Sequence, residues 1–188
     1  NNFVLIFSRP MEIGPKLLNT VVYSMITVAI SVPLALMAAY VFSRYRFRGN
    51  NLLFILVLAT QFIPPVVVVI PFFAVFRRLG MLDTLVALVI VNLAVTVPYA
   101  IWLLKGYVDA LPIEVEEAAF VDGCTDFQVL RLIVLPLVAP GLLIVATLTF
   151  IHCWNEFMFA FLLTSRKAAT LMIALNNTLG VRGIFWEQ

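Results

Sequence analysis

Four long apolar stretches constrain this chain more than any other feature of its sequence. They cover residues 17–42, 52–76, 85–104 and 137–163. A helix needs about 20 apolar residues to cross the hydrocarbon core of a bilayer, and each stretch reaches that length. The chain holds 12 Lys and Arg and 10 Asp and Glu residues, of which only Glu156 lies inside a stretch. The sequence therefore predicts an all-α polytopic membrane protein.

Composition and cysteine usage exclude several other classes. The chain is 63% hydrophobic and 12% charged, whereas a soluble domain is nearer ~45–50% apolar and ~25% charged. A net charge of +2 is too small to indicate a nucleic-acid partner. Cys124 and Cys153 cannot frame a disulfide scaffold and have no metal-ligand spacing. We expect one membrane domain over 1–188, with no metal site.

Two polar stripes run along the predicted spans. Asn92, Thr96 and Tyr99 fall on one face of the third stretch. Asn inside a bilayer needs a partner, so this face meets protein or water and is a candidate translocation path. The first stretch carries small residues at steps of four and three, which favours close helix packing over a solute-lining face. These small residues are Thr20, Ser24, Thr27 and Ser31.

The fourth stretch contains an ionisable cluster. His152, Asn155 and Glu156 are spaced i, i+3 and i+4, within pairing reach on one helical face. An ionisable group at membrane depth is a functional candidate, and structural anchoring of Glu156 is the alternative. Trp154 could stack on a sugar ring, but the favoured interpretation of the aromatic residues here is packing or lipid contact.

The polar segment 105–136 predicts two short helices outside the membrane. Pro112 suits a first helical position, and Gly123 supplies the positive φ that ends a helix. Thr125–Gln128 has capping-box spacing, which predicts a second helix that Pro136 stops. The segment carries six acidic and two basic residues. Two capped helices exceed what a connector needs, so we expect an interaction surface.

A family signature lies in this same segment. Glu117-Ala118-Ala119 is followed by three residues, Gly123, nine residues and Ile133-x-Leu135-Pro136. This matches the EAA signature of ABC importer permeases, and the chain resembles the carbohydrate branch of that family. Agreement extends to Asn19-Thr20, Ala39-Tyr40 with Arg44, Phe47-Arg48-Gly49, Pro64-Pro65, Leu79-Gly80 with Asp83-Thr84, and Trp154-Asn155-Glu156.

The resemblance implies an ABC importer transmembrane domain in the plasma (inner) membrane of a bacterium or archaeon. On this expectation the chain carries helices two to five of a six-helix permease and is truncated at both ends. Segment 105–136 would be a cytoplasmic coupling loop. Its ATPase-contact residues would be Glu117, Ala118, Ala119 and Gly123, supported by Ile133, Leu135 and Pro136. The candidate path residues are Asn92, Thr96, Tyr99, Trp154, Asn155 and Glu156.

The resemblance also implies partners. They are a cytoplasmic ABC ATPase dimer, a second and usually different permease subunit, and an extracytoplasmic solute-binding protein. The chain has no G-x-x-x-x-G-K-[ST] phosphate loop. We therefore expect a non-catalytic subunit that binds no cofactor, with ATP and Mg²⁺ used by the ATPase.

Three alternatives stay open at this point. The first is an ion-coupled secondary transporter that uses Glu156 and His152, which would leave the EAA spacing unexplained. The second is an EAA permease for a polyamine, an amino acid or glycerol phosphate. The third is a membrane scaffold that recruits a cytoplasmic partner without transport.

Overall fold

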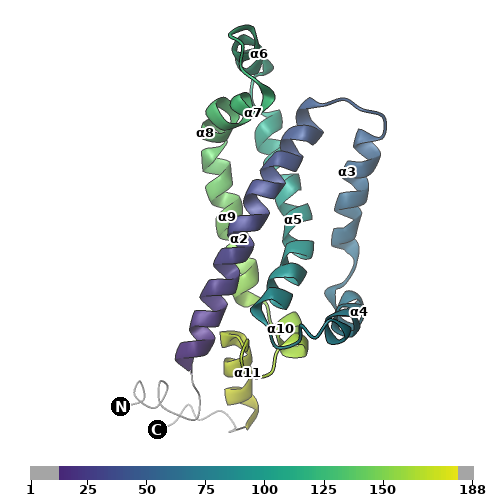
Figure 1. Cartoon of the computed structure of the whole chain (residues 1–188), viewed down its shortest axis with the longest axis vertical. Helices are drawn as coiled ribbons and strands as arrows, with labels where there is room; N and C mark the ends of the chain where they lie inside the picture. Colours follow the sequence, from purple (N-terminus) through teal and green to yellow (C-terminus); the bar gives the residue numbers. More distant parts are fainter. Residues whose placement is uncertain (1–12, 182–188) are drawn as a thin grey trace. The chain divides into compact units, whose positions relative to one another are not determined.

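The computed structural model describes residues 13–181, with side chains from 13 to 176, and every ordered element in that part of the chain is a helix (Figure 1). The helices, in chain order, are α2 (Ile13–Arg44), α3 (Asn50–Ala59), the 3₁₀ turn η1 (Thr60–Phe62), α4 (Pro65–Arg78), α5 (Leu85–Asp109), α6 (Ile113–Val121), α7 (Asp126–Val129), the π-helix η2 (Leu130–Val134), α8 (Leu135–Leu137), α9 (Ala139–Asn155), α10 (Met158–Leu163) and α11 (Leu171–Val181).

Among the described residues, two helices are individually long and apolar enough to cross a membrane. They are α2 and α5. Two further candidates are interrupted pairs: α3–η1 with α4, and Asp126–Leu137 with α9, the latter bent by 77°. If each pair counts as one span, the number reaches four. The prediction of an all-α, multi-pass membrane protein is confirmed.

The chain divides into two compact units, which are described separately. Unit 2 comprises Val28–Phe62 and Ala94–Thr149. Its core joins the later part of α2, the later part of α5 and the first part of α9 to α6, α7 and η2. The buried members are Ala35, Leu36, Ala39, Tyr40, Ala100, Ile101, Leu104, Val108, Ala119, Val129, Val134, Val138 and Val145.

Close packing in unit 2 depends on a glycine. A Cβ atom added to Gly141 on α9 would lie 2.6 Å from Cγ of Tyr107 on α5. Only a residue without a side chain lets the aromatic ring approach the α9 backbone so closely. In the same unit, Gln61 of the second apolar stretch finds a partner outside its own helix, because its side-chain Nε2 donates to Val95 O at 3.0 Å.

Unit 1 comprises Asn1–Thr27, Ile63–Leu93 and Phe150–Gln188, of which 13–27, 63–93 and 150–181 are described. α4 packs against α10, where the rings of Phe72 and Phe159 meet edge to face with centroids 6.4 Å apart. The start of α11 is held by α2, since Leu171 N donates to Thr20 Oγ1 at 2.9 Å.

The stripe of small residues on α2 is buried throughout. Thr20 is 1% exposed, and Ser24, Thr27 and Ser31 are fully buried. The Thr27 hydroxyl finds its hydrogen-bond partner on its own helix, because Oγ1 donates to Tyr23 O at 2.8 Å. The burial agrees with the packing interpretation of the stripe.

Two interruptions depart from simple expectations. Pro136 does not stop the second loop helix, because helical geometry continues through α8 to Leu137. The π-turn just before Pro136 explains why the helix tolerates this proline. Leu135 N donates to Leu130 O, five residues back, so the hydrogen-bond pattern has already shifted by one residue when it reaches Pro136, which has no N–H to donate. In the fourth apolar stretch, the helix breaks at Glu156 and Phe157, between α9 and α10.

Candidate functional site

The α6–α7 hairpin, residues 113–129, is built by local signals. Pro112 precedes α6, and Glu114 and Glu116 occupy its first turn, near the positive end of the helix dipole. Gly123, with φ +86°, follows the C-cap residue Asp122. Its N–H donates to Phe120 O at 3.0 Å. These bonds form the glycine-ended C-cap that the sequence predicts.

The second helix begins at the expected capping box. Gln128 N donates to Thr125 Oγ1 at 3.4 Å, and Thr125 N donates to Gln128 Oε1 at 2.8 Å. Both bonds of the motif are therefore present. The hairpin is thus defined at its start, at its turn and at its second helix. Figure 1 shows α6 and α7 at the end of unit 2 where α2 and α5 terminate.

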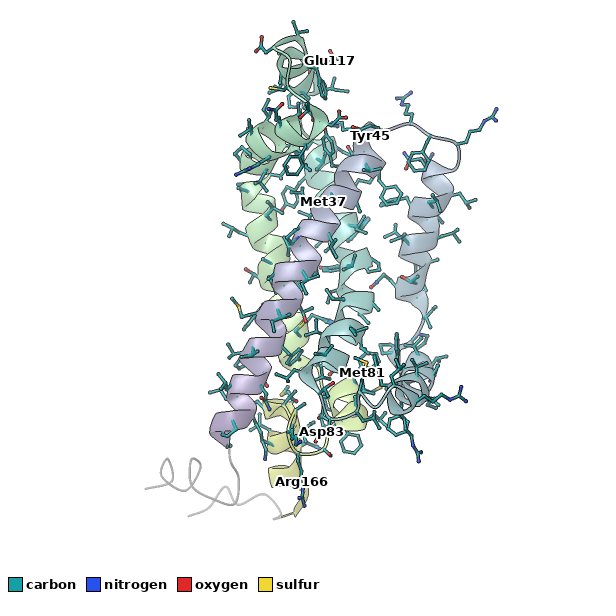
Figure 2. The ribbon with its side chains drawn as sticks, in the orientation of Figure 1. Met37, Tyr45, Met81, Asp83, Glu117 and Arg166 are labelled. Carbon is teal, nitrogen blue, oxygen red and sulfur yellow. The ribbon has the colours of Figure 1, made fainter. Side chains whose placement is uncertain are left out.

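The two faces of α6 differ. Glu116 is 2% exposed and Ala119 is 6% exposed, so this side faces unit 2. Glu117 and Ala118 are exposed on the other side, and Figure 2 shows Glu117 at the outer end of the hairpin. Ala119 therefore serves the packed face, while Glu117 and Ala118 are accessible.

The outer surface of the hairpin is apolar as well as acidic. Val121 is 88% exposed and Ile113 48%. Exposed large apolar side chains that gather on one segment are typical of an interaction surface. Sequence reasoning did not single out these side chains, because their exposure depends on which face of each short helix packs inward.

The remaining signature residues follow the hairpin. Gly123 is exposed in the turn, and Ile133 lies half-buried in η2. Leu135 and Pro136 of α8 are both exposed. Of the seven predicted contact residues, the structure thus brings Glu117, Ala118 and Gly123 together on the accessible hairpin surface.

A buried ionic network joins the packed face of α6 to the ends of two longer helices. Arg44 Nε donates to Glu116 Oε1 at 2.7 Å, and Tyr40 OH donates to Glu116 Oε2 at 3.1 Å. Arg44 Nη2 also donates to the backbone oxygens of Val108 and Leu111, at 2.9 and 3.1 Å. No sequence spacing signals this network, since Arg44 and Glu116 lie 72 residues apart.

A neighbouring contact ties α2 to α7. Tyr45 and Asp126 line the same hollow, and burial, followed by the nearby Asp126 carboxylate, raises the pKa of Tyr45 above its ordinary value. Tyr45 follows the last residue of α2 and Asp126 opens α7. The hairpin is therefore bonded to the end of α2 through α6, while α7 lies beside the same end.

The candidate path residues of α5 are differently placed. Asn92 is fully buried and its Nδ2 donates to Leu88 O at 2.9 Å, on its own helix. Thr96 is 3% exposed. Tyr99 is half-buried, and its ring lies 6.3 Å from that of Trp102. Their burial agrees with a protein-facing stripe.

The polar cluster of the fourth stretch separates at a helix end. Asn155 Nδ2 donates to Ile151 O at 2.9 Å, within α9. Glu156 instead accepts from Phe159 N at 2.6 Å and Ala160 N at 3.0 Å, the first turn of α10. Both side chains are thus directed to backbone partners. Trp154 packs on Phe150, with ring centroids 5.6 Å apart.

A second carboxylate outside the predicted site organises unit 1. Asp83, with φ +58°, donates its N–H to Leu163 O at 2.8 Å. Its carboxylate accepts from four consecutive backbone N–H groups, those of Ser165, Arg166, Lys167 and Ala168, at 2.9 to 3.3 Å. Figure 2 shows Asp83 beside Arg166. We call this arrangement the Asp83 clamp.

The clamp perturbs the acidity of its carboxyl group. Burial alone would raise the pKa of Asp83, but the four N–H donors stabilise the carboxylate and lower the pKa to about 2. Sequence reasoning noted Asp83 only as part of a family match. Its hydrogen bonds to residues 165–168 join segments more than 80 residues apart in the chain, which no local pattern indicates.

Comparison with known proteins identifies the family. The model of the binding-protein-dependent transport system inner membrane component matches residues 17–181, and the chain belongs to this family of ABC transporter permeases. A putative ABC transporter permease of Streptomyces antibioticus is 38% identical over 168 residues, which are 89% of this chain and 73% of that protein.

Relatives with named solutes are similarly close. The trehalose transport system permease protein SugB of Mycobacterium tuberculosis is 37% identical, over 87% of this chain and 60% of that protein. The trehalose/maltose permease protein MalG of Thermococcus litoralis is 35% identical, over 97% of this chain and 66% of that protein. This chain therefore spans about three fifths to two thirds of the length of these two relatives.

A solved structure supports the same fold. A bacterial ABC transporter involved in the import of the acidic polysaccharide alginate superposes with a TM-score of 0.81 and 25% identity, over 95% of this chain and 62% of that chain. The architecture is therefore that of an ABC importer transmembrane domain, and the chain is part of an inner-membrane protein.

Proposed function

We propose that this chain forms the permease part of an ATP-driven sugar importer, and that the α6–α7 hairpin couples it to a separate ATPase. The observation that carries the proposal is the hairpin itself. It presents Glu117 and Ala118 outward on a helix whose opposite face is anchored by Glu116. An acidic side chain flanked by the exposed apolar Ile113 and Val121 suits a groove that offers a basic group within apolar walls.

The coupling would follow from this placement. Two ATPase subunits that close on ATP and Mg²⁺ would displace a hairpin seated in each, and the displacement would switch the path between outward-facing and inward-facing states. The permease itself would hydrolyse nothing. A second permease subunit and an extracytoplasmic binding protein would complete the importer.

The solute assignment rests on relatives. Proteins named for trehalose and maltose transport share 35–37% identity with this chain, and an alginate importer shares the fold. We propose a carbohydrate, passed along a path to which Asn92, Thr96, Tyr99, Trp154, Asn155 and Glu156 contribute.

Co-purification tests the coupling assignment. The full-length protein and its ATPase would be co-expressed, and ATPase recovery compared between wild type, Glu117→Lys and Glu114→Lys. Glu114 is an exposed carboxylate on the same helix and is therefore the matched control. Loss of the ATPase in Glu117→Lys alone would support the proposal. Equal recovery in all three proteins would reject Glu117 as the contact, and no ATPase with wild type would reject the coupling function.

A further inference from the structure

Arg44 and Glu116 form a buried ion pair between the last residue of α2 and the packed face of α6. Their side chains are 12% and 3% exposed, and Arg44 Nη2 lies 2.7 Å from Glu116 Oε1. Since Nε also donates to that oxygen, the guanidinium engages it with two nitrogens. A buried charge pair is held in place only when its other polar atoms are satisfied as well.

The remaining guanidinium contacts bring in a third helix. Val108 and Leu111, whose oxygens accept from Nη2, lie at and just beyond the end of α5. The last carbonyls of a helix have no partner within it, and a cation beside them is favourable. Arg44 therefore joins the ends of α2 and α5 to α6.

The second oxygen of Glu116 also belongs to α2. Tyr40, one turn before Arg44 and 4% exposed, donates to Oε2. Both carboxylate oxygens thus accept bonds from one helix. In the part of the chain whose side chains are described, Glu116 makes every side-chain hydrogen bond that α6 contributes. The polar attachment of α6 to α2 therefore depends on this one residue.

We propose that Arg44 and Glu116 are a positioning pair that transmits movement of the α6–α7 hairpin to α2. The inference rests on the proposed function, in which that hairpin meets the ATPase. Glu117 immediately follows Glu116, so a force on the exposed residue acts on the anchored one. The planar guanidinium fork resists rotation, whereas apolar contacts alone would let α6 slide.

Thiol labelling of the full-length permease in complex with its ATPase, reconstituted in lipid, tests this inference. One reporter is native Cys124 in the hairpin turn, in a Cys153→Ala background. The other is Ser31→Cys on α2, in a protein with both native cysteines replaced. The labelling rate of each thiol by a fluorescent maleimide would be compared without nucleotide and with Mg-ATP and vanadate.

With the wild-type pair, we expect the nucleotide to change both rates. In Glu116→Gln, the change at Cys124 should persist, while the change at Ser31→Cys should shrink about fivefold or more, as expected when an allosteric coupling is lost. Glu114→Gln, on the exposed face of the same helix, should behave as wild type. Arg44→Lys, which keeps the charge without the fork, should also reduce the response and serves if Glu116→Gln does not fold.

Three results would overturn the inference. They are an unchanged response of Ser31→Cys in Glu116→Gln and Arg44→Lys, no response of this thiol with the wild-type pair, or loss of the ATPase from Glu116→Gln. The last result would make the pair a support of the docking surface only. Failure of the proposed function is seen separately, because ATPase recovery with wild type is measured before labelling.

Discussion

Glu116 in unit 2 and Asp83 in unit 1 both tie together segments distant in sequence, but their partners are of opposite kinds. Glu116 is buried and meets a guanidinium and a phenol. Asp83 is half-buried, and among the described residues its carboxylate accepts from four consecutive backbone N–H groups. The first carboxylate is neutralised by a charged side chain, whereas the second is bound by uncharged N–H groups that the backbone conformation directs toward it.

The difference predicts which property of each side chain matters. An amide in place of Glu116 would keep a hydrogen-bond acceptor but leave the Arg44 charge buried without a counter-charge. An amide in place of Asp83 would keep one carbonyl oxygen for the N–H groups, which carry no formal charge. Neutral substitutions should therefore harm the two sites unequally.

The largest effect is expected for Arg44→Ala. This change leaves the Glu116 carboxylate buried without its cation, and breaking a buried pair in this way costs about 3–5 kcal/mol. The measurement is denaturant unfolding of the full-length protein in detergent. Lys105→Ala is the control, because the Lys105–Asp109 pair is partly exposed and lies within one helix. Equal losses in the two variants would show that the Glu116 network rearranges around the missing cation.

Asp83→Ala should have the next largest effect. It removes the acceptor of four N–H groups, and we expect a loss of about 2 kcal/mol, since solvent can reach some of the freed donors. Asp83→Asn should lose less, because Asn tolerates the positive φ of this residue and retains one oxygen. If Asp83→Asn proved as damaging as Asp83→Ala, the negative charge would be the essential property and the contrast with Glu116 would fail.

How far the sequence predicts these sites depends on the range of the interactions. The α6–α7 hairpin is predictable because Pro112, Gly123 and the Thr125–Gln128 box act within a few residues. The helical membrane class is predictable because hydropathy is a property of each stretch alone. These local features are enough to predict that Glu117 lies on a short helix next to a tight turn, outside the apolar stretches.

The Arg44–Glu116 pair and the Asp83 clamp are not predictable in this way. Each depends on how helices pack, which composition does not specify. The break at Glu156 and Phe157 is similar: neither Gly nor Pro marks it, and the side chain of Glu156 stabilises it by capping α10. The π-turn before Pro136 likewise reflects packing of the loop helices.

Acid should weaken the Asp83 clamp. The pKa of Asp83 is lowered from 3.8 to about 2, so the clamp contributes its full stability above about pH 4 and loses it as the pH falls towards about 2. The effect should be smaller than that of Asp83→Ala, since a protonated carboxyl retains a carbonyl oxygen. The thermal midpoints of wild type and Asp83→Asn, compared over this range, should converge as the pH falls. A constant difference would exclude ionisation of Asp83 as its source.

The smallest effect is expected for Tyr40→Phe, which separates the bond donated by the uncharged phenol from the bonds donated by the charged guanidinium in the Glu116 network. It removes one hydrogen bond to Oε2 while the ring still fills its place in the core, and a bond to a carboxylate contributes about 1.5 kcal/mol or somewhat more. Tyr45→Phe is the matched control, because Tyr45 is 41% exposed and water can replace its hydroxyl. If Tyr40→Phe costs about 1.5 kcal/mol and Arg44→Ala about two to three times more, the charge pair dominates the network. Equal losses would mean that phenol and guanidinium act as one cooperative unit, and Glu116 would then depend on arrangement as much as Asp83 does.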